Sequence, residues 1–118
     1  MDVQAIIEKF RPAIIQIAAP ESNGTGFYLT EYNLIITNFH VTEGVSELII
    51  KGKSFDKTFT KVWYTDKKHD LSFLKPPDNV EFGNVSLGNY ETLKDGDDVI
   101  AIGHPFGLSY SATLGVIS

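Results

Sequence analysis

The feature that most constrains the fold is a series of short apolar segments separated by turn-forming residues. These segments are five to eight residues long, and each is bounded by Gly, Asn, Asp or Pro. Segments of this length and composition favour strands over helices. The predicted strands cover residues 13–19, 24–30, 34–38, 47–51, 58–65 and 71–75. Six short strands at this spacing predict an all-β fold, either a small antiparallel barrel or a sandwich.

Two further features flank these strands. At the N-terminus, Asp2 can cap a short helix over residues 3–10, and Pro12 ends it. After the last strand, the segment KPPDNVEFGNVSLGNYETLKDGDD is rich in charge and in turn formers, which is typical of a surface connection. Apolar residues return at 99–103 and 111–117, and we expect these two strands to form a hairpin.

The composition argues against several classes of partner and cofactor. The chain has 118 residues and a net charge of −5, which argues against nucleic acid or an anionic membrane surface as a partner. It has no cysteine and only three scattered histidines, so we expect no disulfide, no metal and no cofactor. We find neither a signal peptide nor an apolar run long enough to span a bilayer. The compartment stays open between the cytoplasm and, for a processed chain, the periplasm or the exterior.

Two residues are placed where chemistry is common. His40 follows the apolar strand in LIITNFHVTEG, and Asp70 opens the strand DLSFLK, 30 positions later. Both lie at strand ends, where a rigid scaffold can direct side chains toward each other. A His–Asp pair is what a nucleophilic serine requires behind it, because the carboxylate orients the imidazole that takes the serine proton. The alternative is a loop histidine and an unrelated capping aspartate.

Four segments, in order, resemble the HtrA/Deg-type trypsin-like serine proteases. The first is GTGFYLTEYNLIITNFHV, similar to their Gly-x-Gly-Phe and Thr-Asn-x-His-Val motifs, and the second is HDLSFLK, similar to Asp-Leu-Ala-x-Leu-Lys. The third and fourth are LKDGDDVIAIGHPFGL and SATLGVIS, which resemble the Ala-Ile-Gly-Asn-Pro-Phe-Gly segment and the strand after it. The resemblance covers the chain from about residue 14 to residue 118.

The resemblance implies a fold and a division of the chain. It implies a six-stranded antiparallel trypsin-like barrel with a short N-terminal helix, followed by the first hairpin of a second barrel. Residues 1–75 would form the helix and first barrel, residues 76–97 the connection, and residues 98–118 the hairpin. It also implies that His40 is the general base and Asp70 its orienting carboxylate, with polypeptides as substrates.

One departure from the family is large. The family's nucleophile lies in a Gly-Asn-Ser-Gly-Gly segment, which this sequence lacks. By the resemblance, the chain is the N-terminal half of a serine endopeptidase, without a nucleophile and inactive by itself. Two alternatives stay open: a pseudoprotease or binding module that kept the first barrel, and an unrelated β-barrel interaction domain. Contact between His40 and Asp70 would argue against the last.

The sequence also predicts the environment of several aromatic residues and of the other two histidines. The aromatic residues in and just before the predicted strand 58–65 are expected to pack in the core rather than to form a peptide-binding platform; they are Phe55, Phe59, Trp63 and Tyr64. His69 is predicted to be a solvated turn residue. His104 stands where the family usually has Asn, and we expect it only to satisfy a loop.

The hairpin at 98–118 leads to a prediction about assembly. Its strands are apolar, carry no proline and leave their edges unpaired. It can fold back onto its own barrel or pair with the same hairpin of a second copy. We expect the second, a two-fold homodimer, because identical edges can satisfy each other.

Overall fold

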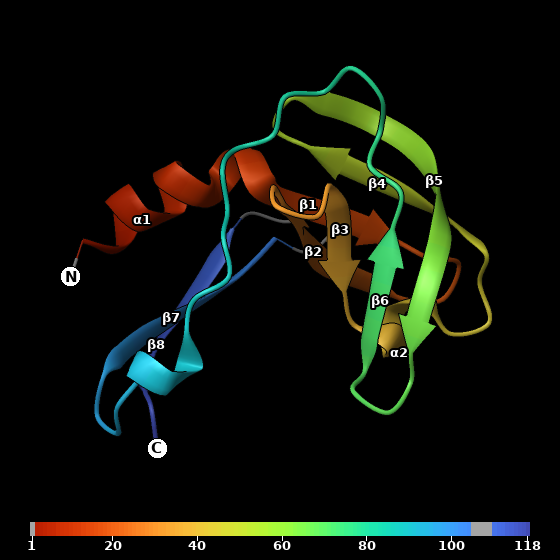
Figure 1. The fold of residues 1–118 in the computed structure, drawn as a ribbon. Helices are drawn as coiled ribbons and strands as arrows, with labels where there is room; N and C mark the ends of the chain where they lie inside the picture. Colours follow the sequence, from red (N-terminus) through yellow and green to blue (C-terminus); the bar gives the residue numbers. More distant parts are fainter. Residues whose placement is uncertain (1, 105–109) are drawn as a thin grey trace.

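The computed structural model describes residues 2–104 and 110–118, and a closed six-stranded antiparallel barrel forms its larger part (Figure 1). The barrel strands are β1 (Ile14–Ala18), β2 (Asn23–Leu29), β3 (Leu34–Thr37), β4 (Glu47–Gly52), β5 (Phe55–Asp66) and β6 (Leu71–Leu74). Around the barrel they follow the order β1-β2-β3-β6-β5-β4, and β1 closes it by pairing with both β2 and β4. The predicted all-β class and the barrel are confirmed.

Helices occupy the ends and turns of the fold. The helix α1 (Val3–Phe10) begins where predicted, because the Asp2 side chain accepts the Ala5 N–H at 3.0 Å. A short 3₁₀ turn, η1 (Arg11–Ala13), leads into the barrel. Neither α1 nor any shorter helix within the described residues has the length and apolar character that crossing a bilayer requires.

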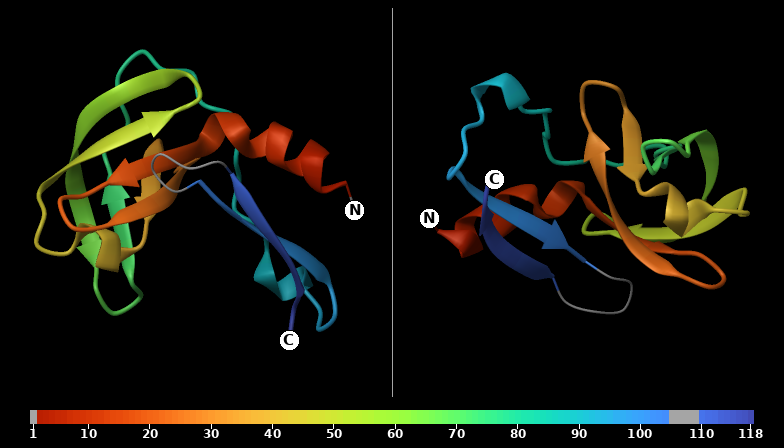
Figure 2. Two further views of the ribbon diagram at one scale, coloured as in Figure 1. Left: turned by 180° about the vertical axis from the view of Figure 1, so that it is seen from behind. Right: turned by 90° about the horizontal axis from the view of Figure 1, so that it is seen from below.

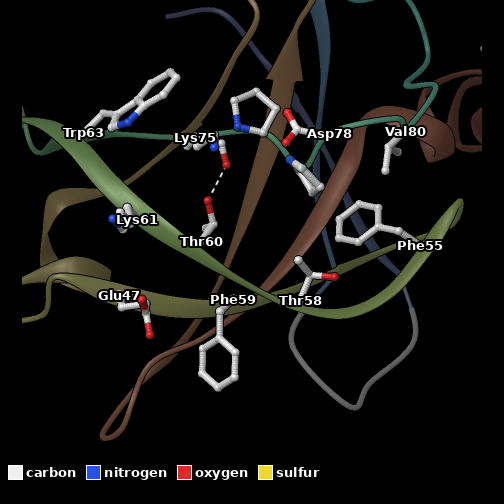
Figure 3. Close-up of a pocket in the computed structure, with 12 residues that line it drawn as sticks. Glu47, Phe55, Thr58, Phe59, Thr60, Lys61, Trp63, Lys75, Asp78 and Val80 are labelled. Atoms are coloured by element: carbon white, nitrogen blue, oxygen red, sulfur yellow. Dashed lines mark hydrogen bonds between the residues drawn. The ribbon is translucent and has the colours of Figure 1, made fainter.

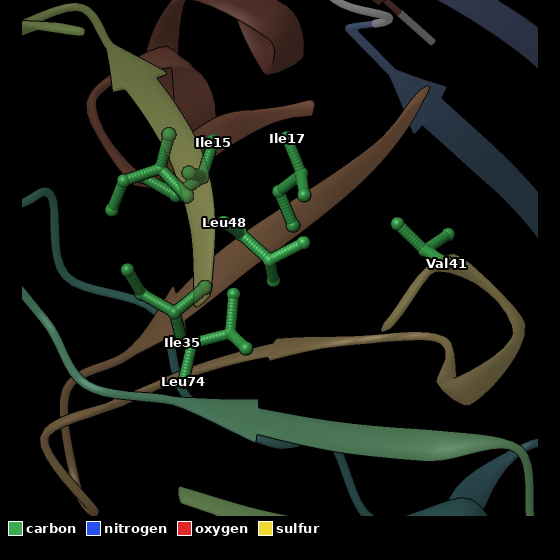
Figure 4. Packing of buried hydrophobic residues seen from close by; sticks show 7 residues of the cluster. Ile15, Ile17, Ile35, Val41, Leu48 and Leu74 are labelled. Atoms are coloured by element: carbon green, nitrogen blue, oxygen red, sulfur yellow. The ribbon is translucent and has the colours of Figure 1, made fainter. Parts of the chain in front are cut away.

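The barrel interior is filled by aliphatic side chains. The fully or nearly fully buried members of the cluster are Ile15, Ile17, Ile35, Val41, Leu48, Ile50 and Leu74 (Figure 4). Each such side chain stabilises the fold by roughly 1.5–3 kcal/mol when it leaves water. Val41 is the one member that does not come from a strand; it lies in the short helix α2 (Phe39–Thr42) after β3 and ties that helix to the core.

The prediction for the aromatic residues of β5 is wrong for three of the four. Phe59, Trp63 and Tyr64 are 68%, 55% and 65% exposed. The aliphatic cluster already fills the interior, so the rings lie outside it. Phe59 and Trp63 lie at the margin of a cavity of about 520 Å³ along β5 (Figure 3). Phe55 alone packs against the core.

The connection after β6 is attached to the barrel rather than lying loosely over its surface. The Phe82 ring stacks on Tyr28 at a centroid distance of 4.2 Å and packs on the core cluster. The Thr30 N–H donates to the Val85 carbonyl at 3.3 Å, and the Val85 N–H donates back to the Thr30 hydroxyl at 3.0 Å. A 3₁₀ turn, η2 (Tyr90–Thr92), precedes the hairpin.

The C-terminal hairpin is a separate two-stranded sheet of β7 (Asp98–Gly103) and β8 (Ser111–Val116). It lies beside α1 and the start of the barrel (Figure 2). Ile100 and Ile102 line a cavity of about 240 Å³ together with Phe10 and Phe27, and the His104 N–H donates to the Thr25 hydroxyl at 2.9 Å. One face of the hairpin therefore meets its own barrel, while β8 is exposed along its whole length.

Close packing between β2 and β3 predicts a specific cost at Gly26. A Cβ on Gly26 would lie 2.8 Å from the Ile36 carbonyl oxygen and 2.9 Å from Ile17 Cδ1. Gly26→Ala is expected to lower the free energy of unfolding by roughly 1–3 kcal/mol, because a backbone carbonyl in a paired strand cannot yield. Gly88→Ala is the control, since no atom beyond Gly88 and its two chain neighbours lies within 4 Å of the Cβ position, and it is expected to change stability by less than about 1 kcal/mol. Urea unfolding measures both, and equal effects would contradict the prediction.

Candidate active site

His40 lies on a single helical turn, α2 (Phe39–Thr42), where the sequence predicted a loop. The turn forms because Asn38 is extended at its start and the Thr42 hydroxyl donates to the Phe39 carbonyl at 3.1 Å. The same hydroxyl is 2.6 Å from the buried Ser72 hydroxyl on β6. With Val41 in the core, these contacts hold the backbone around His40.

Asp70 lies in the turn between β5 and β6, with a left-handed backbone (φ 55°) that is uncommon for a residue with a side chain. Its carbonyl accepts the Phe39 N–H at 3.0 Å and the Asn38 side-chain amide at 3.2 Å. The segment after β3 and the turn before β6 are therefore joined through their backbones next to His40.

One carboxylate holds both the ring and the backbone of His40. The His40 Nδ1 lies 2.8 Å from Asp70 Oδ2, and the His40 N–H donates to Asp70 Oδ1 at 2.8 Å. The contact predicted between the two side chains is thus present. The His40 side chain is 68% exposed and that of Asp70 45%, so the pair opens to solvent.

The hydrogen bonds between His40 and Asp70 determine which atoms of the two side chains carry a hydrogen. The hydrogen bond from the His40 ring, followed by that from the His40 backbone N–H, lowers the pKa of the Asp70 carboxyl below its ordinary value. An ionised carboxylate only accepts hydrogen bonds, so Nδ1 carries the hydrogen and a neutral ring has its lone pair on Nε2. The arrangement can accept a proton at Nε2 and stabilise the resulting imidazolium.

A cavity of about 490 Å³ lies beside the histidine and is lined by His40, Ser22, Glu21 and Glu43, among others. The Ser22 hydroxyl donates to the Val41 carbonyl at 3.3 Å and not to the imidazole. Among the residues that the structure describes, no serine hydroxyl is hydrogen-bonded to the His40 ring.

Comparison with known proteins identifies the family. The family model of the trypsin-like peptidase domain matches residues 24–118. This chain belongs to that family. The barrel, the separate hairpin and the resemblance to HtrA/Deg-type proteases are confirmed by this match and by the relatives below.

The relatives that it matches are serine proteases. A probable periplasmic serine endoprotease DegP-like from Pseudomonas savastanoi pv. phaseolicola is 37% identical over 98 residues, which are 83% of this chain and 20% of that protein. Serine protease HTRA4 from Mus musculus is 29% identical over 98% of this chain and 26% of its own length. A solved structure, an HtrA-type protease AlgW with tripeptide, superimposes with a TM-score of 0.82 at 28% identity, over 95% of this chain and 38% of that chain. The chain thus spans about a fifth to a quarter of the length of these curated relatives.

The sequence predicted the contact between His40 and Asp70 but not the further contacts that hold the two residues. The Asn38 side-chain amide donates to the Asp70 carbonyl, and the Thr42 and Ser72 hydroxyls are paired. These small polar residues lie within two positions of His40 or Asp70 in the sequence, and that proximity was the signal that could have predicted the supporting contacts. His69 was predicted to be a solvated turn residue; it is exposed but bonded to Asp66.

The lowered pKa of Asp70 predicts a pH dependence of stability. A carboxyl with a lowered folded pKa stabilises the fold above its unfolded pKa, about 3.9, and that contribution is lost as pH falls through the folded value. Asp70→Asn is therefore expected to be less stable at pH 7 and to lose less stability on acidification. Urea unfolding between pH 7 and 2.5 measures this. Asp95→Asn, an exposed carboxylate that does not contact His40, is the charge-matched control. Parallel curves for Asp70→Asn and wild type would contradict the prediction.

Proposed function

We propose that this chain supplies the general base and the orienting carboxylate of a serine endopeptidase. His40 is the base and Asp70 the orienting group, and polypeptides are the substrates. The observation that carries the proposal is the double contact of one carboxylate with the Nδ1 and the backbone N–H of His40. The match to the trypsin-like peptidase domain supports it, as does the tripeptide present with the solved relative.

In this proposal, His40 acts through Nε2. Asp70 holds the ring so that Nε2 faces the nucleophile, and the serine proton passes to Nε2 as the oxygen attacks the peptide carbonyl. The imidazolium, stabilised by the Asp70 carboxylate, then gives that proton to the leaving amine. The solvent-open side of the pair is where a serine and a peptide would approach.

We further propose that the 118-residue chain by itself is inactive. The sequence contains no Gly-Asn-Ser-Gly-Gly segment, and Ser22, which shares a cavity with His40, donates to a backbone carbonyl instead. The division into residues 1–75, 76–97 and 98–118 belongs to the same proposal. The nucleophile and the oxyanion donors would come from strands that follow the hairpin in the family.

Activity measurements test the proposal directly. The chain is expected neither to cleave casein nor to react with a serine-directed phosphonate, because removal of a triad member abolishes most of the acceleration. A chimera that continues this chain with the rest of the Pseudomonas DegP-like protease is the positive control. In the chimera, Asp70→Asn is expected to lower kcat roughly 10⁴-fold, the effect of a wrong histidine tautomer in a trypsin-like site. Labelling of one serine in the chain alone, or full activity of the Asp70→Asn chimera, would refute it.

The homodimer through residues 98–118 also stays a proposal. Ile100 and Ile102 already face the barrel, but Leu114 and Val116 on β8 are exposed and remain available to a second copy. Light scattering at micromolar and tenfold higher concentration is expected to show a dimer that Leu114→Lys weakens, because the new charge would be buried in the interface. A monomer at both concentrations would mean that docking onto the barrel is the hairpin's sole role.

A further inference from the structure

The turn between β5 and β6 contains a second His–Asp pair that repeats the pattern of the first. The His69 Nδ1 lies 2.8 Å from Asp66 Oδ2, and the His69 N–H donates to Asp66 Oδ1 at 3.1 Å. One carboxylate again holds both the ring and the backbone of a histidine. This second pair ends at the residue immediately before Asp70.

The backbone of Asp70 needs support on both sides. Its left-handed conformation is unfavourable in a residue with a Cβ, so surrounding contacts must hold it. On the C-terminal side, the Asp70 carbonyl accepts two hydrogen bonds, from Phe39 and Asn38. On the N-terminal side, the Asp70 N–H makes only a long bond, 3.3 Å, to the Lys67 carbonyl. The residue before it, His69, supplies the carbonyl of the peptide bond to Asp70.

We propose that Asp66 and His69 are positioning residues for Asp70. Asp66 is the last residue of β5 and pairs with Leu71, so its carboxylate starts from the rigid barrel. By holding the ring and the N–H of His69, it fixes the residue whose carbonyl forms the peptide bond to Asp70, and so directs the Asp70 carboxylate toward His40. The link to catalysis rests on the proposed function, whereas the coupling between the two pairs does not.

The charges in the turn agree with this role. The His69 ring hydrogen bond, followed by the His69 backbone N–H, lowers the pKa of Asp66 below its ordinary value, which keeps the acceptor ionised at neutral pH. Lys67 and Lys68, the other charged residues of the turn, make no side-chain hydrogen bond to either carboxylate. The Lys68 backbone N–H also donates to the Asp66 carboxylate, so within the turn only the His69 contact joins that carboxylate to a side chain.

NMR of the 118-residue chain tests the proposal with a rescue variant. His69→Ala removes the ring donor, whereas an Asn amide at position 69 can still donate to Asp66, so His69→Asn is expected to retain wild-type behaviour. Both variants remove the imidazole, and their difference therefore reports geometry and not charge. Lys68→Ala is the control in the same turn.

Three readouts follow the first pair in each variant. In His69→Ala, exchange of the His40 backbone N–H is expected to accelerate roughly three- to tenfold, the range for the loss of one net hydrogen bond. The fraction of the Nδ1–H tautomer of His40 falls, and the pKa of Asp70 moves up toward its ordinary value. Thr37 and Leu74 in the barrel keep their exchange rates.

Specific outcomes would overturn the proposal. Unchanged His40 exchange and tautomer in His69→Ala would show that the pairs are independent. Equal acceleration of exchange at Leu74 would show general destabilisation.

A second variant and the chimera test the proposal independently. Asp66→Asn is expected to alter the same readouts at His40. In the active chimera, His69→Ala is expected to lower kcat with KM unchanged. A chimera with no activity in any form refutes the proposed function but leaves the NMR result to decide the coupling.

Discussion

The antiparallel pairing of β3 with β6 is the contact on which the site depends. Its last register pair is Thr37 with Ser72. Continuing that register places the residues after β3 opposite the turn before β6, which is where the Phe39 N–H meets the Asp70 carbonyl. Residues 30 positions apart thus become neighbours through one strand pair. Any slip of the β3–β6 register would separate His40 from Asp70 and turn the alternate side chains away from the core.

Closure of the barrel fixes the register between β3 and β6. Because β1 pairs with both β2 and β4, the six strands leave little freedom for one pair to slide. The aliphatic cluster then fills the interior, and Val41 extends it under the histidine turn (Figure 4). The exposed candidates His40 and Asp70 therefore stand on a closed and densely packed barrel, and a fixed support is what orientation of an imidazole requires.

The predictable parts of the structure are those with a local pattern. Strand existence followed from short apolar runs between turn formers, and the helix start at Asp2 followed from its capping chemistry. The contact of His40 with Asp70 was predictable because both lie at strand ends and match motifs of one family. Their catalytic roles are not tested by the structure and stay predictions.

The parts that could not be predicted depend on tertiary competition. Phe59, Trp63 and Tyr64 are apolar in sequence, but the aliphatic side chains take the interior, so the rings lie outside. The strand β5 begins at Phe55, earlier than predicted, because Gly52 and Phe55 pair across a two-residue turn. Phe82 lies in a charged, turn-rich segment that gave no sign of stacking on Tyr28.

Two features of the site, its exposed ion pairs and the left-handed backbone of Asp70, contribute little to stability or oppose it. Exposed ion pairs contribute little to folding, and both His–Asp pairs are substantially exposed. A left-handed backbone at Asp70 is unfavourable in itself. A turn selected for stability alone would place Gly or Asn there, because those residues adopt this conformation more easily. Asp at this position instead directs a carboxylate at an imidazole while its own carbonyl holds the neighbouring segment. The unfavourable conformation is held by four hydrogen bonds to residues 38–40, a combination that the proposed role of Asp70 in orienting His40 would account for.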